Sequence, residues 1–106
     1  MLDAILRLNA DAAAHDEYEV AYHLLMAALH VADHAHDFGA LERITKLTQE
    51  QGAQLEALQP PHQLSRAHAR VRGQTAVFDS LIAHIEAVRL RMQSDEQRKR
   101  VPRASA

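Results

Sequence analysis

Apolar residues recur every three or four positions along almost the whole chain, and this pattern stops at only three places. Such spacing puts apolar side chains on one side of an α-helix, because a helix turns once in about 3.6 residues. The interruptions lie near Asp16, near Gly39 and at Pro60 and Pro61, and these residue types commonly begin or end helices. The sequence therefore predicts an all-α protein with four helices.

Local signals at the three interruptions set the expected boundaries. Asp16 followed by Glu19 has the spacing of a capping box, so we expect a helix to begin there. Asp37 is placed to cap the next helix, and Pro61 suits the first turn of the last one. The inward side of the first helix includes a polar residue, Asn9. The predicted helices run over about 2–14, from the Asp16 cap to about 36, from the Asp37 cap to the prolines, and from Pro61 to about 93.

The fourth predicted helix is much longer than its neighbours. Its roughly 32 residues would span about 48 Å, against about 30 Å for the second and third helices. The shorter helices would leave part of its apolar side uncovered, and we expect a homodimer to bury that strip. The alternative is a break at Gly73 that folds the last stretch back onto its own bundle. The residues expected to mediate self-association are Leu81, Ile82, Ile85, Val88 and Met92.

The length of 106 residues allows one domain, for which we expect an antiparallel bundle over residues 1–94. From residue 95 to 106 the chain is charged and nearly without core residues, so a disordered basic tail is expected there. No segment has the roughly 20 apolar residues that span a bilayer, and the N-terminus lacks the pattern of a signal peptide. We therefore expect a cytoplasmic protein without a membrane partner.

Charge is distributed unevenly between the two halves of the chain. Residues 1–58 contain three basic and ten acidic side chains, whereas residues 59–106 contain nine basic and four acidic ones. Such asymmetry favours folding of the halves against each other, or self-association, over binding to a polyanion. Arg66, Arg70 and Arg72 have no aromatic residue beside them on which a base could stack, so we do not expect nucleic acid as a partner.

The first third of the chain resembles a tetratricopeptide repeat. Its second helix matches the aromatic, alanine and leucine spacing of helix B in that family. The first helix departs from the family, since Asn9 replaces a small residue and Ala12 a tyrosine, and Asp33 stands in place of the terminal proline. The resemblance covers residues 2–35 and implies a helical hairpin. The matching residues are Tyr18, Ala21, Leu25, Ala28 and Leu29.

Three histidines of the second predicted helix are the residues of this sequence that best fit a metal site or a pH-sensitive surface. On a helical wheel His23, His30 and His34 lie on one strip of the second helix, opposite a broad apolar face that includes Val20, Leu24 and Val31. One reading is a solvated polar face, and another is a surface that responds to pH. A third is a transition-metal site, because His30 and His34 are one turn apart and an acidic side chain could complete it. The candidate ligands are His30, His34 and Asp37.

Signals for catalysis are absent from the sequence. The three glycines stand alone, so no phosphate-binding loop is present, and no serine has a nucleophile motif around it. The chain has no cysteine. We therefore expect a non-enzymatic helical protein-protein interaction module that self-associates and needs no cofactor. A metal-binding bundle that uses the histidines of the second helix is the alternative.

Overall fold

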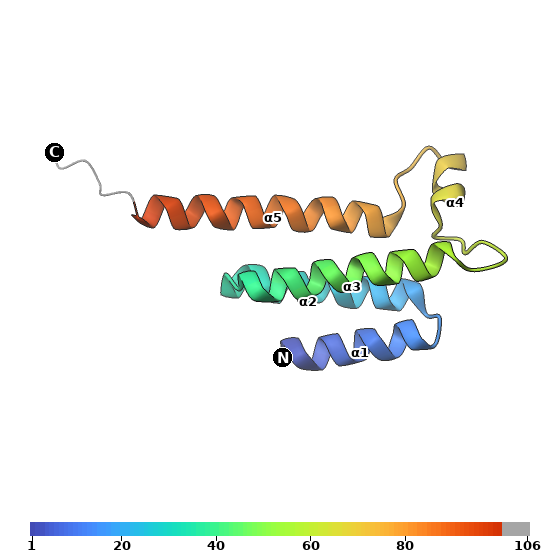
Figure 1. The fold of residues 1–106 in the computed structure, drawn as a ribbon, viewed down its shortest axis with the longest axis horizontal. Helices are drawn as coiled ribbons and strands as arrows, with labels where there is room; N and C mark the ends of the chain where they lie inside the picture. The colour runs from blue at the N-terminus through green and yellow to red at the C-terminus, as the bar shows by residue number, and fades with distance from the viewer. Residues whose placement is uncertain (101–106) are drawn as a thin grey trace.

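The computed structural model describes residues 1–100, and every regular element among them is a helix (Figure 1). The prediction of an all-α fold is confirmed, but the described chain contains five helices rather than four. No helix in this part of the chain is both long enough and apolar enough to cross a bilayer. The helices are α1 (Leu2–Ala14), α2 (Tyr18–Ala35), α3 (Phe38–Glu56), α4 (Arg66–Val71) and α5 (Val77–Arg100).

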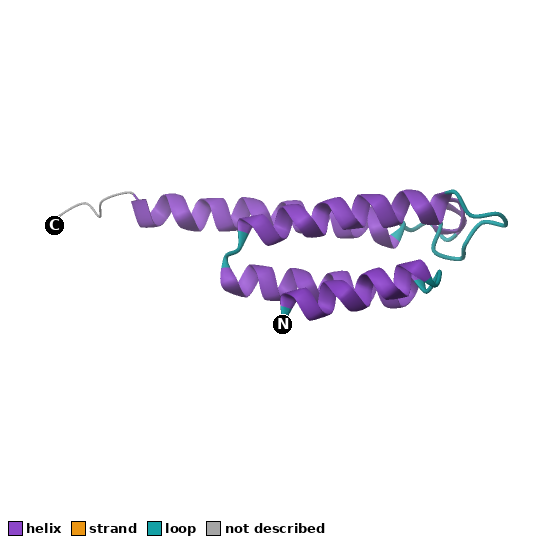
Figure 2. Cartoon of the chain, turned by 60° about the horizontal axis from the view of Figure 1, so that its bottom comes forward, coloured by secondary structure: helices purple, strands orange, loops and turns teal. Residues whose placement is uncertain are grey.

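The four long helices run alongside one another, and in Figure 1 α2 and α3 overlap, with α5 above them and α1 below. α2 and α3 pack against each other in the middle, α1 packs mainly on α2, and α5 packs on α3 and to a lesser extent on α2. In Figure 1, α1 and α3 run one way and α2 and α5 run the other, and Figure 2 shows the loops at the ends of the long helices. The Cα extents are 64 × 32 × 15 Å and the radius of gyration is 16.4 Å, whereas a compact chain of this length has about 13 Å. α1 and α5 therefore form opposite edges of the molecule.

The core is aliphatic and is centred on α2, α3 and α5. Leu25 and Ile44 are fully buried where α2 meets α3, and Met92 is equally buried on α5. Gly52 of α3 allows close approach of α5, because a Cβ atom there would lie 3.3 Å from Cβ of Phe78. Asn9 is buried on α1 as expected, and its side chain hydrogen-bonds to both α2 and α3.

Three helices end in the same way, with one residue in the left-handed backbone conformation. These residues are Asp16 (φ 57°), His36 (φ 51°) and Gly73 (φ 68°). In each case the next backbone N–H donates to a carbonyl five residues earlier, which is the hydrogen bond of a Schellman motif. The three bonds run from Glu17 to Ala12 (2.9 Å), from Asp37 to Ala32 (3.0 Å) and from Gln74 to Ala69 (2.8 Å).

This geometry corrects the expected capping box at Asp16. Asp16 ends α1 in the left-handed conformation, so it cannot also be the extended N-cap of α2. The N-cap of α2 is Glu17, whose side chain makes no capping hydrogen bond. The expected cap at Asp37 is confirmed, because its Oδ1 accepts a hydrogen bond from the Ala40 N–H at 3.0 Å.

The single long fourth helix was the wrong expectation, since the chain breaks at Gly73 into α4 and α5. α4 also begins later than the expected start at Pro61, because Ser65 is its N-cap and Ser65 Oγ accepts a hydrogen bond from the His68 N–H at 3.3 Å. No neighbouring atom lies within 4 Å of a Cβ built on Gly73, so the backbone conformation rather than space favours glycine there.

The last helix also extends beyond its expected end at residue 93. α5 continues to Arg100, so residues 95–100 are helical rather than disordered. Ion pairs one turn apart support this exposed end, with Arg98 at 2.9 Å from Asp95 and Lys99 at 3.8 Å from Glu96. The rest of the expected tail, residues 101–106, lies outside the described residues.

The left-handed residue at the end of α2 gives a direct test of these helix ends. We predict that His36→Gly raises the free energy of unfolding by up to about 1 kcal/mol, because glycine adopts this conformation without a Cβ clash. The matched control, Ala10→Gly at an exposed position inside α1, should lower it by about 1 kcal/mol. Urea unfolding followed by circular dichroism measures both. A loss of stability in His36→Gly would contradict the assigned backbone conformation.

Candidate functional site

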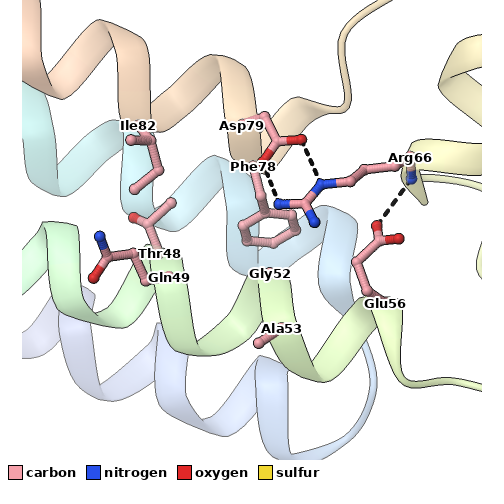
Figure 3. A pocket seen from close by; sticks show the side chains of 9 residues that line it. All are labelled: Thr48, Gln49, Gly52, Ala53, Glu56, Arg66, Phe78, Asp79 and Ile82. Carbon is pink, nitrogen blue, oxygen red and sulfur yellow. Dashed lines mark hydrogen bonds and ion pairs between the residues drawn. The ribbon is translucent and has the colours of Figure 1, made fainter.

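An open groove of about 590 Å³ lies between α3 and α5 (Figure 3). α3 contributes small and polar side chains, α5 contributes Phe78 and Ile82, and Arg66 from the start of α4 covers one end. Figure 3 shows the Arg66 side chain reaching across to Asp79. The lining residues are Thr48, Gln49, Gly52, Ala53, Glu56, Arg66, Phe78, Asp79 and Ile82.

The charged groups of this groove bind one another. Arg66 donates from Nε to Asp79 Oδ2 and from Nη2 to Asp79 Oδ1, both at 2.8 Å, and its backbone N–H donates to Glu56 Oε2 at 2.9 Å. The hydrogen bonds from Arg66 hold the pKa of the Asp79 carboxyl below its usual value, although partial burial opposes the shift. These contacts fasten α4 to α3 and α5. Arg66 and Asp79 meet only because the chain reverses at Gly73, so sequence spacing gave no signal for this pair.

The three predicted metal ligands do not form one group in the described part of the chain. His30 and His34 are exposed on neighbouring turns of α2, but a carboxylate oxygen of Asp37 accepts the capping hydrogen bond at the start of α3. Among residues 1–100 no group of three or more His, Asp or Glu side chains is arranged to hold a metal ion. The two histidines remain as a pair, which is fewer than the three or four protein ligands of a zinc site.

The predicted self-association strip lies mostly inside the molecule. Leu81, Ile85, Val88 and Met92 are each 5% exposed or less, and the half-buried Ile82 lines the groove. The break at Gly73 explains this difference, because it lets α5 fold back so that its apolar side packs on α2 and α3 of the same chain. The exposed strip that motivated a dimer through these residues is therefore absent from the described chain.

Other apolar side chains remain exposed or half-buried along both edges. On the α1–α2 side, Leu8 is 57% and Val20 is 48% exposed; on α5, Leu90 is 54% exposed. We call the apolar surface on the α1–α2 side the outer face, and the apolar surface on α5 the α5 row. The outer face consists of Leu8, Val20, Leu24, Ala27 and Val31, and the α5 row of Ala83, Ala87 and Leu90. The sequence pattern had placed Val20, Leu24 and Val31 in one broad apolar face, without separating core residues from exposed ones.

Comparison with known proteins identified no relative of this chain: no family model, no curated protein and no solved structure matches it.

The Arg66–Asp79 pair predicts a pH-dependent contribution to stability. Both side chains are more than a third exposed, so Asp79→Asn should lower the free energy of unfolding by about 1 kcal/mol at most at neutral pH. The folded-state pKa of Asp79 is lowered, so this contribution is present above the unfolded pKa of about 3.9 and is lost as pH falls through the lower folded value.

Thermal unfolding of the wild type and Asp79→Asn at neutral and strongly acidic pH measures this difference. Asp95→Asn is the control, because its partner Arg98 lies on the same helix and ties no segments together. If Asp79→Asn lowered the thermal stability at neutral pH no more than Asp95→Asn does, the Arg66–Asp79 ion pair would not stabilise the position of α4.

Proposed function

We propose that this protein is a non-enzymatic helical protein-protein interaction module that self-associates. The observation that supports the proposal is the presence of large apolar side chains, Leu8, Val20 and Leu90, on the outside of a flat molecule. Apolar surface that gathers into a patch is usually an interaction site, because its exposure to water is unfavourable. Shape adds to this, since a flat arrangement of helices offers long surfaces to a partner.

The polar chemistry of the described chain agrees with a structural role. Asn9 and Gln51 hydrogen-bond to each other in the core, Arg66 binds Asp79, and Asp37 caps α3. Each of these groups is held by contacts that maintain the fold. This use of polar side chains favours an interaction module over an enzyme.

We further propose that α1, α2, α3 and α5 act as one antiparallel four-helix bundle, with α1 and α2 as a hairpin of the tetratricopeptide type. The likeness of residues 2–35 to that repeat and the close packing of α1 on α2 support this view. Two alanines of the family pattern, Ala21 and Ala28, are fully buried, as close helix packing requires.

Self-association is proposed to use the α5 row in place of the buried strip. Ala83, Ala87 and Leu90 recur at helical spacing on the side of α5 that faces away from the core, and Leu90 is its one large side chain. Two such rows, one from each copy, could pack in a two-fold contact, because small residues let helices approach closely.

We predict that the wild-type protein sediments as a dimer at tens of micromolar and that Leu90→Asp shifts it to monomer, because a charge would be buried in the contact. Val71→Asp on α4 is the matched control, since Val71 is 88% exposed but lies outside the α5 row. Circular dichroism should show unchanged helicity in both variants. A monomeric wild type, or a dimer that survives Leu90→Asp, would refute self-association through this row.

A further inference from the structure

We propose that the outer face of α1 and α2 binds a basic amphipathic helix of a partner protein. This inference rests on the proposed function and specifies the surface and the class of partner. Three observations carry it: the direction in which the face points, its separation from the core, and the charge around it.

Hydrogen bonds show which way α1 is turned. The buried Asn9 side chain contacts both α2 and α3, and on one flank of Asn9 the carboxylate of Asp3 lies 3.4 Å from Arg43 of α3. Asp3 and Leu8 lie about 120° and 100° from Asn9 in opposite directions around the helix. Leu8 therefore lies on the flank of α1 that faces away from α3.

Burial, an ion pair and a hydrogen bond likewise show how α2 is turned. Its buried Leu25 points into the core, and Asp33 on one flank forms an ion pair with Arg91 of α5. Ala21, whose carbonyl accepts a hydrogen bond from Asn9 of α1, lies on the other flank. The α2 residues of the outer face, which are Val20, Leu24, Ala27 and Val31, lie about 100–160° from Leu25 on that α1 side. They therefore adjoin α1 and point away from the core.

Burial agrees with this placement. Leu24 and Val31 are half-buried, yet they belong neither to the hydrophobic core nor to the partly buried residues packed against it. Along α2 the outer face extends from Val20 to Val31, about three helical turns or 16 Å. A partner helix of three to four turns would cover this length. The side chains of α1 and α2 form neighbouring ridges, and a partner helix could pack between them.

The negative charge near the outer face indicates what kind of partner helix would bind there. Residues 1–37 contain seven acidic side chains and one arginine, Arg7, and two of the acids, Asp3 and Asp33, form ion pairs with arginines of α3 and α5. At the α1–α2 turn four exposed carboxylates gather, and within residues 1–100 none of them pairs with a lysine or arginine. These residues are Asp11, Asp16, Glu17 and Glu19.

Asp11 lies 3.5 Å from His15, but the carboxylates beside the apolar face have no lysine or arginine partner among residues 1–100. Such a face suits a helix with apolar residues on one side and lysine or arginine on the other. A second copy of the same face would be repelled, because it brings its own carboxylates to the contact. The face and the α5 row are also on opposite edges, so one molecule could use both.

The test uses a fluorescent synthetic peptide of four helical turns with leucine on one side and lysine on the other, titrated with the full chain. Two matched peptides replace every lysine by glutamate or every leucine by serine. Fluorescence anisotropy should show binding of the lysine peptide at least about tenfold tighter than either matched peptide, and added salt should weaken it.

Variants locate the binding surface. Val20→Ser with Leu24→Ser should weaken binding of the lysine peptide about tenfold, whereas Val71→Ser on the exposed side of α4 should leave it unchanged. Leu8→Ser, at a more exposed position, provides the same test if the double variant unfolds. Glu17→Gln with Glu19→Gln should also weaken binding, in contrast to Glu42→Gln with Glu50→Gln on the exposed side of α3.

Equal binding of the glutamate peptide would overturn the assignment of a basic partner, and binding that ignores the outer-face variants would overturn the assigned surface. If no peptide binds while Leu90→Asp still disrupts a dimer, this inference fails and the proposed interaction module stands. If neither association is observed, both proposals fail.

Discussion

The hydrogen bonds of Asn9 determine how the first helix sits on the rest of the molecule. Asn9 and Gln51 are 0% and 4% exposed, and their amides donate to each other at 3.0 Å and 2.5 Å, while Asn9 also donates to the Ala21 carbonyl at 2.8 Å. One side chain thus joins α1, α2 and α3. Leaving either amide buried without its partner would cost about 1–3 kcal/mol, so rotation or sliding of α1 is unfavourable. This rotation of α1 also places Leu8 next to the α2 residues of the outer face.

At the other edge of the molecule, the chain reversal at Gly73 determines whether the apolar side of α5 packs into the core. Because the chain turns back there, the apolar side of α5 completes the core, and the Arg66–Asp79 pair fastens the short α4 across the turn. A continuous helix would instead have exposed that side and used it for pairing between copies. The resulting molecule has a buried core, with the outer face and the α5 row at opposite edges, and we therefore propose that it contacts other proteins.

The sequence predicted those features that depend on neighbouring residues. Helical periodicity gave the fold class, and the cap at Asp37 followed from its position before a helical segment. Asp16 was misassigned because an aspartate before a helix can be either an N-cap or the left-handed end of the preceding helix, and only the backbone conformation distinguishes them. The pairing of Arg66 with Asp79 and the exposure of Leu8 and Val20 depend on how distant segments pack, which local spacing does not encode. The candidate metal ligands His30, His34 and Asp37 do not form a group of three among residues 1–100, and one carboxylate oxygen of Asp37 caps α3.

We propose that the outer face of α1 and α2 is an interaction surface, and amide NMR tests this most directly. Adding the lysine and leucine peptide to the isotope-labelled chain should shift the amide signals of Leu8, Val20, Leu24 and Val31. Signals from Thr48, Gly52 and Ile82, which line the groove between α3 and α5, should remain in place. Shifts concentrated on those groove residues, with the outer-face signals unchanged, would contradict the account.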